Sequence, residues 1–168
     1  FSEARQKLKW EACRELMDAS ATSVYRCDYN TWHGYRVWAI DGSKMQLPSD
    51  SELRETFGKT GSTGGGSGVA AQSSCLYDVL NDIIGDAYLE PIATDERTLA
   101  LRHLKHLENM ESYGKELVIM DRGYASAKLI QAFLDANVRF LMRVRKKFNL
   151  DIDSFPVGDH RYTLGQIP

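Results

Sequence analysis

The sequence predicts an α/β domain built on a mixed sheet, and three observations lead to this fold class. Residues 117–120 are four consecutive apolar residues between polar neighbours, a pattern typical of a strand buried on both faces in the parallel part of a sheet. Residues 69–79 and 83–89 have strand character and lie close enough to form a hairpin. The expected order is three strands with hairpin links, then helix, strand, helix and strand.

The first 35 residues predict a helix followed by a connector. Apolar residues recur with roughly helical spacing from Phe1 to about Asp18, and Ser2 is a candidate N-cap. This helix is expected to pack on the sheet or on a region before it. Residues 19–35 are irregular, and the lone His33 there is more typical of a surface residue than of a ligand.

The first predicted strand covers residues 36–40 and ends in the acid Asp41. Residues 43–48 are expected to be extended, and residues 51–57 to form a helical turn. The glycine-rich segment 58–68 lacks the spacing of a phosphate-binding P-loop. We therefore interpret that segment as a flexible loop between strands.

A helix is expected after the hairpin, with Thr94 as its N-cap and two acids in its first turn, where they complement the helix dipole. Its buried face is predicted to consist of Leu101, Leu104 and Leu107. His103 and His106 are three residues apart and could in principle share a metal. Their predicted place on the polar side of a surface helix favours solvation instead.

The strand at residues 117–120 runs directly into Asp121. Gly123 permits a sharp turn, and Ser126 is a candidate N-cap for the next helix. Asp121 is therefore expected at the carboxyl end of a central strand, where open α/β sheets place their chemistry.

The helix after this strand is expected to end at Asn137 in the left-handed conformation. Its predicted buried residues are Leu129, Ile130, Phe133 and Leu134. Residues 138–144 alternate in polarity and predict a further strand. The chain then becomes polar and irregular after residue 150, with strand character again at 161–164.

Two predicted strands thus end in an acid, Asp41 and Asp121. In one sheet, the two carboxylates would meet at one edge, and hard oxygen ligands in that arrangement suit Mg²⁺ or Mn²⁺. The alternative is that each Asp merely opens a turn, which is ordinary Asp-Gly chemistry. The pair, together with the motifs below, favours the metal interpretation.

Length and composition set the outer limits. The 168 residues suffice for about one domain, and the 43% apolar and 26% charged fractions argue against disorder. No apolar run approaches the roughly 20 residues of a membrane span, and no signal peptide is recognisable. The scattered cysteines Cys13, Cys27 and Cys75 indicate no disulfide framework, so a reducing cytoplasm is the default.

Charge is distributed unevenly along the chain. The formal net charge is −2, yet residues 122–149 contain seven basic residues and one acid, an excess of six. Such asymmetry is consistent with a phosphate-binding face. It is equally consistent with a solvated strand edge, because Lys and Arg block edge pairing.

Several motifs together resemble a known family. They are Ile-Asp-Gly-Ser-x-x-x-Leu-Pro at 40–48, Phe-Gly at 57–58, Met-Asp-Arg-Gly-Tyr at 120–124, Phe-Leu-x-Arg at 140–143 and the opening residues 1–8. They resemble the cut-and-paste DDE transposases of bacterial insertion sequences, of the insertion-sequence-four type. The resemblance covers roughly residues 1–148, and the two Asp motifs carry most of its specificity.

The resemblance implies a ribonuclease H-like mixed sheet flanked by helices. In that family the first Asp lies on the first strand and the second just after the fourth, positions that match Asp41 and Asp121 here. A third acid, a Glu within a Tyr-Arg-Glu-Lys signature, lies on a later helix after a β-rich insertion. No Glu follows Glu116 in this sequence, so we expect a catalytic-domain fragment truncated before the last catalytic helix.

The expected division of this fragment has three parts. Residues 1–35 form the N-terminal helix and connector, residues 36–150 a partial ribonuclease H-like catalytic core, and residues 151–168 the start of an insertion subdomain.

The activity that the resemblance implies is metal-dependent cleavage and transfer of DNA strands at transposon ends. Two Mg²⁺ (or Mn²⁺) ions would be held by Asp41, Asp121 and the Glu that is missing here, so this fragment should bind metal poorly and not turn over. The expected DNA-binding residues are Lys44, Arg122, Arg143, Arg145 and Lys146. Tyr124 could stack on a base or pack in the core, and packing is favoured.

The implied partners are double-stranded DNA, as transposon ends and target, and further copies of the protein assembled on that DNA. No membrane is involved, and the expected location is the bacterial cytoplasm, at the nucleoid. Two alternatives stay open. One is an inactive or domesticated transposase derivative that binds DNA without cutting it, and the other is a different ribonuclease H-like nuclease or a metal-dependent phosphatase.

Overall fold

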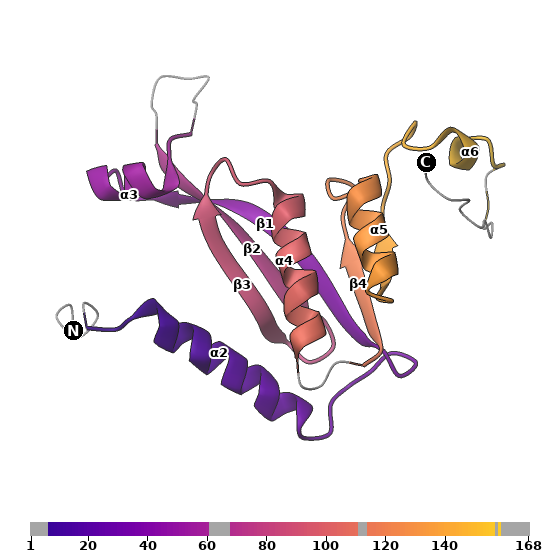
Figure 1. The fold of residues 1–168 in the computed structure, drawn as a ribbon, viewed down its shortest axis with the longest axis horizontal. Coiled ribbons are helices and arrows are strands. Elements are labelled where there is room, and N and C mark those ends of the chain that lie inside the picture. Colours follow the sequence, from indigo (N-terminus) through magenta and orange to yellow (C-terminus); the bar gives the residue numbers. More distant parts are fainter. Residues whose placement is uncertain (1–6, 61–67, 111–113, 157, 159–168) are drawn as a thin grey trace.

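The computed structural model describes residues 7–60, 68–110, 114–156 and 158 (Figure 1). In chain order the elements are helix α2 (Trp10–Tyr25), strand β1 (Arg36–Leu47), helix α3 (Ser51–Phe57), strands β2 (Val69–Asp78) and β3 (Ile83–Pro91), helix α4 (Glu96–Asn109), strand β4 (Glu116–Met120), helix α5 (Ala127–Asp135), strand β5 (Arg139–Met142) and helix α6 (Leu150–Asp153). None of the helices in these ranges combines the length and apolar character needed to cross a bilayer.

The strands form one five-stranded sheet in the order β3-β2-β1-β4-β5. Strand β2 pairs antiparallel with both β1 and β3, whereas β4 runs parallel to both β1 and β5. The predicted mixed sheet is therefore confirmed. Asp41 lies on the first strand and Asp121 directly follows the fourth, in agreement with the expected ribonuclease H-like fold.

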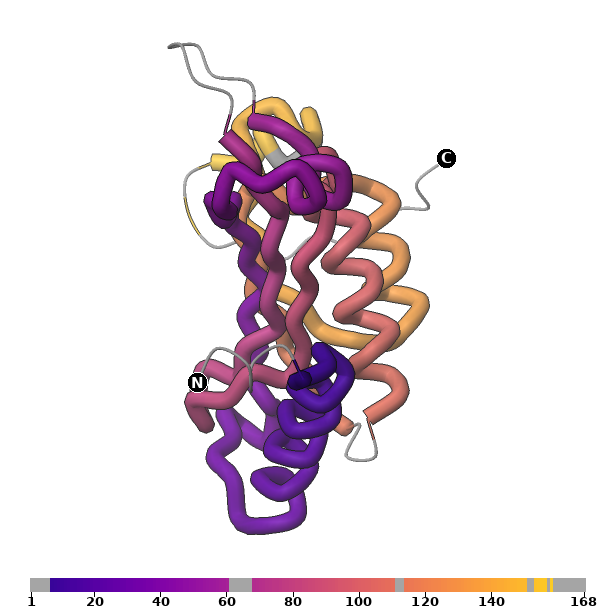
Figure 2. The backbone as a smooth tube through the Cα atoms, turned by 90° about the vertical axis from the view of Figure 1, so that its left-hand side faces the viewer, coloured from indigo at the N-terminus to yellow at the C-terminus, as the bar shows by residue number. Residues whose placement is uncertain are grey.

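The hydrophobic core lies between the sheet and the helices on one of its faces. Helices α4 and α5 cover this face together, and the C-terminal end of α2 reaches the same core (Figures 1 and 2). The core residues from the central strands are Trp38, Ile40, Leu76, Val118 and Met120. On the opposite face, Leu89 of β3 is 45% exposed and Leu141 of β5 is 61% exposed, so that face is open.

The parallel pairing of β1 with β4 starts at a buried ion pair. Arg36 and Glu116 are partners in the strand register, and each is 2% exposed. The Arg36 guanidinium donates to both carboxylate oxygens of Glu116, and Trp38 Nε1 donates to Glu116 Oε2 at 2.6 Å. Buried charges are tolerated only when paired, so this contact favours one register between the two strands.

The predicted hairpin and the predicted ends of α5 are confirmed. Strands β2 and β3 pair along their length around the turn that precedes Ile83. Ser126 caps α5 by accepting a hydrogen bond from the Leu129 N–H, and Asn137 has a φ of 53°.

The N-terminal helix begins and ends later than predicted. It runs from Trp10 to Tyr25 rather than to Asp18, and residues 7–9 before it are not helical; the predicted start at Phe1 and the cap Ser2 lie outside the described residues. The Tyr25 hydroxyl donates to the buried Asp78 at 2.6 Å, so a contact distant in sequence fixes the C-terminal end of the helix. Leu16, which was expected on the packed face, is 69% exposed.

Strand β1 is longer than predicted, and the expectation that it ends at Asp41 is wrong. Strand β2 continues to pair with it as far as Leu47, which faces Val69. Asp41 therefore lies inside a 12-residue strand. It is strand β4 that ends beside Asp41, because its pairing with β1 ends at Ile40 and Met120.

Smaller differences occur around the later elements. Asp95, not Thr94, occupies the N-cap position of α4, and Leu134 of α5 is 51% exposed rather than buried. Leu117 and Ile119 are only half-buried, because no described helix covers their face of β4 as α4 and α5 cover the other.

Three predictions concern the C-terminal part. Strand β5 covers only four residues of the predicted 138–144, and the short helix α6 lies where irregular structure was expected. The predicted strand at 161–164 lies outside the described residues.

Gly85 provides the room that Trp38 needs, and this gives a stability test. A Cβ atom at position 85 would lie 2.5 Å from Cζ3 of Trp38, which is fully buried. Gly85→Ala should lower the free energy of unfolding by about 1–3 kcal/mol, the usual cost of overpacking. In Gly68→Ala the new Cβ would meet its nearest neighbour at 3.5 Å, so this control should be near neutral. Urea unfolding measures both, and equal midpoints would contradict the packing argument.

Candidate metal centre

The strand register brings Asp41 and Asp121 together. The β1–β4 ladder ends at the pair Ile40 and Met120, so the two acids are the next residue on each chain, where neighbouring strands lie about 4.8 Å apart. Ile40 and Met120 belong to the core under α4 and α5. Since side chains alternate along a strand, Asp41 lies on the open face; Asp121 directly follows β4, and both acids are exposed.

Backbone N–H groups hold one oxygen of each carboxylate. Asp41 Oδ1 accepts from the Gly42 N–H at 2.8 Å, and Asp121 Oδ1 accepts from the Gly123 N–H at 2.6 Å. A Cβ at position 123 would lie 2.9 Å from Asp121 Oδ1. A glycine there lets the backbone approach the carboxylate, and these hydrogen bonds leave Oδ2 of each Asp for another ligand.

Two exposed carboxylates fit a hard divalent cation as a partial site. Mg²⁺ is commonly bound through one or two carboxylates, with waters and substrate phosphates as the other ligands. Within the described ranges, no third His, Cys, Asp or Glu completes a cluster of three. The donor set therefore suits an ion that shares its coordination with a bound phosphate.

Tyr124 forms the floor below the strand that carries Asp41. Its side chain is 1% exposed, so the packing interpretation is correct. A Cβ atom on Gly42 would lie 3.4 Å from the Tyr124 hydroxyl and 3.1 Å from Gln72 Nε2. Burial and then the negative charges of Glu96, Asp41 and Asp121 raise the pKa of Tyr124, so the phenol stays protonated at neutral pH.

A buried chain of polar groups runs from β2 to the N-terminal helix. Ser74 Oγ lies 3.0 Å from His103 Nε2, His103 Nδ1 lies 2.7 Å from Asp86 Oδ2, and Arg14 reaches Asp86 Oδ1 at 2.6 Å. The order Ser-His-Asp is that of a hydrolytic triad. Here Ser74 is 2% exposed and the other two are fully buried, so no substrate reaches the hydroxyl and the chain is structural.

The prediction that His103 lies on the polar side of its helix is therefore wrong. Leu99 and Leu107, four residues before and after it, are fully buried. This helical spacing was the signal in the sequence that places His103 on the buried stripe of α4.

Asp86 is charged at neutral pH despite its burial. Burial alone would raise its pKa, but the hydrogen bond and charge of His103, followed by the charges of His106 and Arg14, outweigh it and lower the pKa. The carboxylate thus holds α2 and α4 against β3.

The predicted DNA-binding residues occupy two places. Arg122 follows Asp121 directly, and the Arg143 N–H donates to the carbonyl of Met120 at 3.3 Å, so the basic run starting at Arg143 begins beside the acid pair. The side chains of Arg122, Arg143, Arg145 and Lys146 are exposed. Lys44 is also exposed, but strand alternation places it on the face opposite to Asp41.

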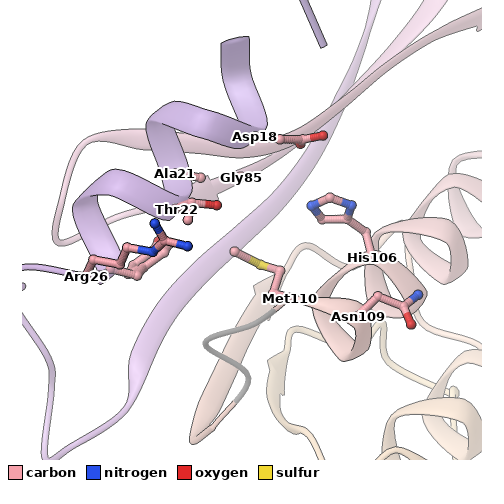
Figure 3. Close-up of a pocket in the computed structure, with 9 residues that line it drawn as sticks. Asp18, Ala21, Thr22, Arg26, Gly85, His106, Asn109 and Met110 are labelled. Atoms are coloured by element: carbon pink, nitrogen blue, oxygen red, sulfur yellow. The ribbon is translucent and has the colours of Figure 1, made fainter. Parts of the chain in front are cut away.

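A separate cavity of about 520 Å³ lies on the helix-covered side (Figure 3). Its lining comes from α2, α4 and the strand between them, and includes Asp18, Thr22, Gly85, His106 and Met110. Neither Asp41 nor Asp121 lines this cavity, so it is distinct from the candidate metal centre.

The chain matches one family model and is similar to several solved structures. The family model described as transposase DDE domain matches residues 32–166. No curated protein matches the sequence. A simian T-cell lymphotropic virus intasome structure, in complex with a PP2A regulatory subunit, is similar with a TM-score of 0.46 and 13% identity over 78% of this chain and 45% of that one.

A piggyBac transposase synaptic complex with hairpin DNA is similar with a TM-score of 0.44 and 12% identity. That match covers 67% of this chain and 23% of the other. The chain thus spans less than half the length of either of these two proteins.

The acid dependence of stability tests the polar chain. Because the folded pKa of Asp86 is lowered, its contribution is present above the usual carboxyl pKa of about 3.9 and is lost as the pH falls through the folded value. Between pH 6 and pH 3 the wild type should therefore lose more free energy of unfolding than Asp86→Asn, measured by urea unfolding. Asp135→Asn, at an exposed site on α5, should keep the wild-type slope. Equal losses in wild type and Asp86→Asn would refute the assignment.

Proposed function

Because the chain belongs to the transposase DDE domain family, we propose that it is the catalytic region of an enzyme that cuts and transfers DNA strands. Asp41 and Asp121 are its first two metal-binding acids. The observation that supports this assignment is the strand register: on two adjacent parallel strands, the acids are the next residues after the paired Ile40 and Met120. The motifs around them favour the bacterial insertion-sequence-four type.

The residues of this chain have defined roles in the proposal. Asp41 and Asp121 hold Mg²⁺ or Mn²⁺, and the Gly42 and Gly123 N–H groups orient them. The bound ions supply a polarised water and neutralise charge that develops on the phosphate. Arg122 and the basic run from Arg143 hold the DNA backbone beside the acids, because guanidinium groups bind phosphate in a fixed, bidentate geometry.

The proposed site needs a third acid, a Glu on a later helix, and no Glu follows Glu116 in this sequence. Two carboxylates carry only half of the charge of two divalent ions and few of their ligands, so we expect weak metal binding and no turnover by the 168-residue chain. The whole protein is proposed to act on double-stranded DNA at transposon ends and to assemble as a homo-oligomer on that DNA.

Metal binding gives the direct test of the acid pair. Mn²⁺ titration of the chain, followed by electron paramagnetic resonance, should show weak binding that Asp41→Asn or Asp121→Asn reduces at least tenfold, since each removes half of the charged donor set. Asp135→Asn removes one exposed charge elsewhere and should bind like the wild type. Equal Mn²⁺ affinity in wild type and Asp121→Asn would contradict the assignment of Asp121 as a metal ligand.

Strand transfer by the whole protein separates the remaining alternatives. Transposon-end DNA should be cut and joined by the wild type and by Asp135→Asn, but not by Asp121→Asn. DNA binding without cleavage by the wild type would instead indicate an inactive derivative. Equal cleavage of end DNA and unrelated duplex would indicate a different nuclease.

The salt dependence of DNA binding tests the basic run. Replacing Arg143, Arg145 and Lys146 together by Ala should reduce the slope of log K against log salt concentration by about 0.9 for each lost phosphate contact. Fluorescence anisotropy with a labelled duplex measures this slope. The matched triple variant replaces the exposed residues Lys7, Lys9 and Lys105 and should leave the slope nearly unchanged. The same slope change in both variants would mean that only net charge matters.

A further inference from the structure

A tight hairpin turn precedes β1 and presents an aromatic residue at each end. Trp32 and Tyr35 exchange two backbone hydrogen bonds, of 2.9 and 2.8 Å. The residues between them, His33 and Gly34, have φ values of 49° and 80°, as a two-residue type I′ turn requires. The turn therefore fixes the backbone positions of both aromatic residues.

Trp32 is unusually accessible for its residue type. Its side chain is 55% exposed, and its ring meets the His33 ring edge-on, with centroids 4.6 Å apart. Large aromatic side chains are normally well buried in a core. An exposed indole on a fixed turn offers a ring for stacking at a low cost in conformational entropy.

Two cations flank the other aromatic residue of the turn. The Arg139 guanidinium carbon lies 4.9 Å from the centroid of the Tyr35 ring, and Lys115 Nζ lies 5.9 Å from it. Both cations are exposed. The nearby Glu116 does not neutralise them, because it is buried in its pair with Arg36.

Arg139 of this surface lies on the same side of the sheet as Asp41. Arg139 is the register partner of Leu117, and Leu117 is paired with Val37, which shares its face of β1 with Asp41. Asp41 lies five residues after Arg36, which is about 17 Å along strand β1. Figure 1 shows the connector beside the start of β4, at the opposite end of the strand from Asp121.

We propose that Trp32, His33, Tyr35, Lys115 and Arg139, the hairpin patch, bind unpaired DNA. Trp32 stacks on a base while Lys115 and Arg139 contact phosphates, the combination by which proteins hold single strands. The choice of DNA rests on the proposed function. The patch adds to it a second contact that directs a single strand along the open sheet face toward the acids.

Two exposed tryptophans make a matched test. Trp10, on α2, is 72% exposed and lies outside the hairpin patch, whereas Trp38 is fully buried. A labelled 15-nucleotide oligothymidine, measured by anisotropy without divalent ions, should bind Trp32→Ala about tenfold more weakly than the wild type, the loss expected for one stacked base. Trp32→Phe should recover most of the affinity, and Trp10→Ala should match the wild type.

The two cations and the fold of the variants are measured separately. Lys115→Ala with Arg139→Ala should lower the single-strand salt slope by about 1.4, because each phosphate contact contributes about 0.7. Thermal unfolding should show that Trp32→Ala is folded. If it is not, Trp32→Leu takes its place, because it keeps apolar bulk but has no ring to stack on a base, and it should show the same loss of single-strand affinity.

The outcomes separate this inference from the proposed function. Trp32→Ala should weaken oligothymidine binding by the same factor in the wild-type and in the Asp121→Asn background, since Asp121 lies outside the patch; loss of Mn²⁺ binding concerns the acid pair alone. Equal oligothymidine affinity in wild type and Trp32→Ala, or equal losses in the Trp32 and Trp10 variants, would overturn the patch. A change in self-association instead of DNA affinity would show that it is a protein interface and would overturn it as well.

Discussion

The register between β1 and β4 is the constraint on which the candidate site depends. Arg36 and Glu116 open the parallel ladder, and Asp41 and Asp121 each follow five residues later. Because side chains alternate, a slip of one residue would move one acid to the helix-covered face. It would also leave a buried guanidinium and a buried carboxylate without their partner, at a cost of several kcal/mol. The same ion pair that stabilises the core therefore also aligns the acids.

Much of the sheet could be predicted because its signals are local. Apolar runs and turn residues define the strands, and the two Asp motifs lie next to them. The error at Asp41 has a physical reason: β1 looks like a strand that ends at the acid, but β2 continues to pair with it to Leu47. Strand ends are set by partners distant in sequence, and no local pattern reports where those partners stop.

Buried polar groups account for two of the remaining misses, the side of His103 and the end of α2. His103 and Asp86 look like surface residues because each is charged or polar, yet both are fully buried and satisfy each other. The same holds for Asp78, which binds the hydroxyl of Tyr25 and thereby places the end of α2 beyond its predicted limit. Pairing between distant residues removes the solvation cost, and it is this pairing that the linear sequence does not display.

The contacts of α2 also determine whether this helix can be separated from the sheet. Arg14 and Tyr25 of this helix supply partners to Asp86 and Asp78, two carboxylates with no exposed surface. Gene segments that began at the connector would encode a sheet in which each of these two buried carboxylates has lost one of its partners. Recombination between related genes is therefore expected to keep helix α2 and the sheet together as one unit.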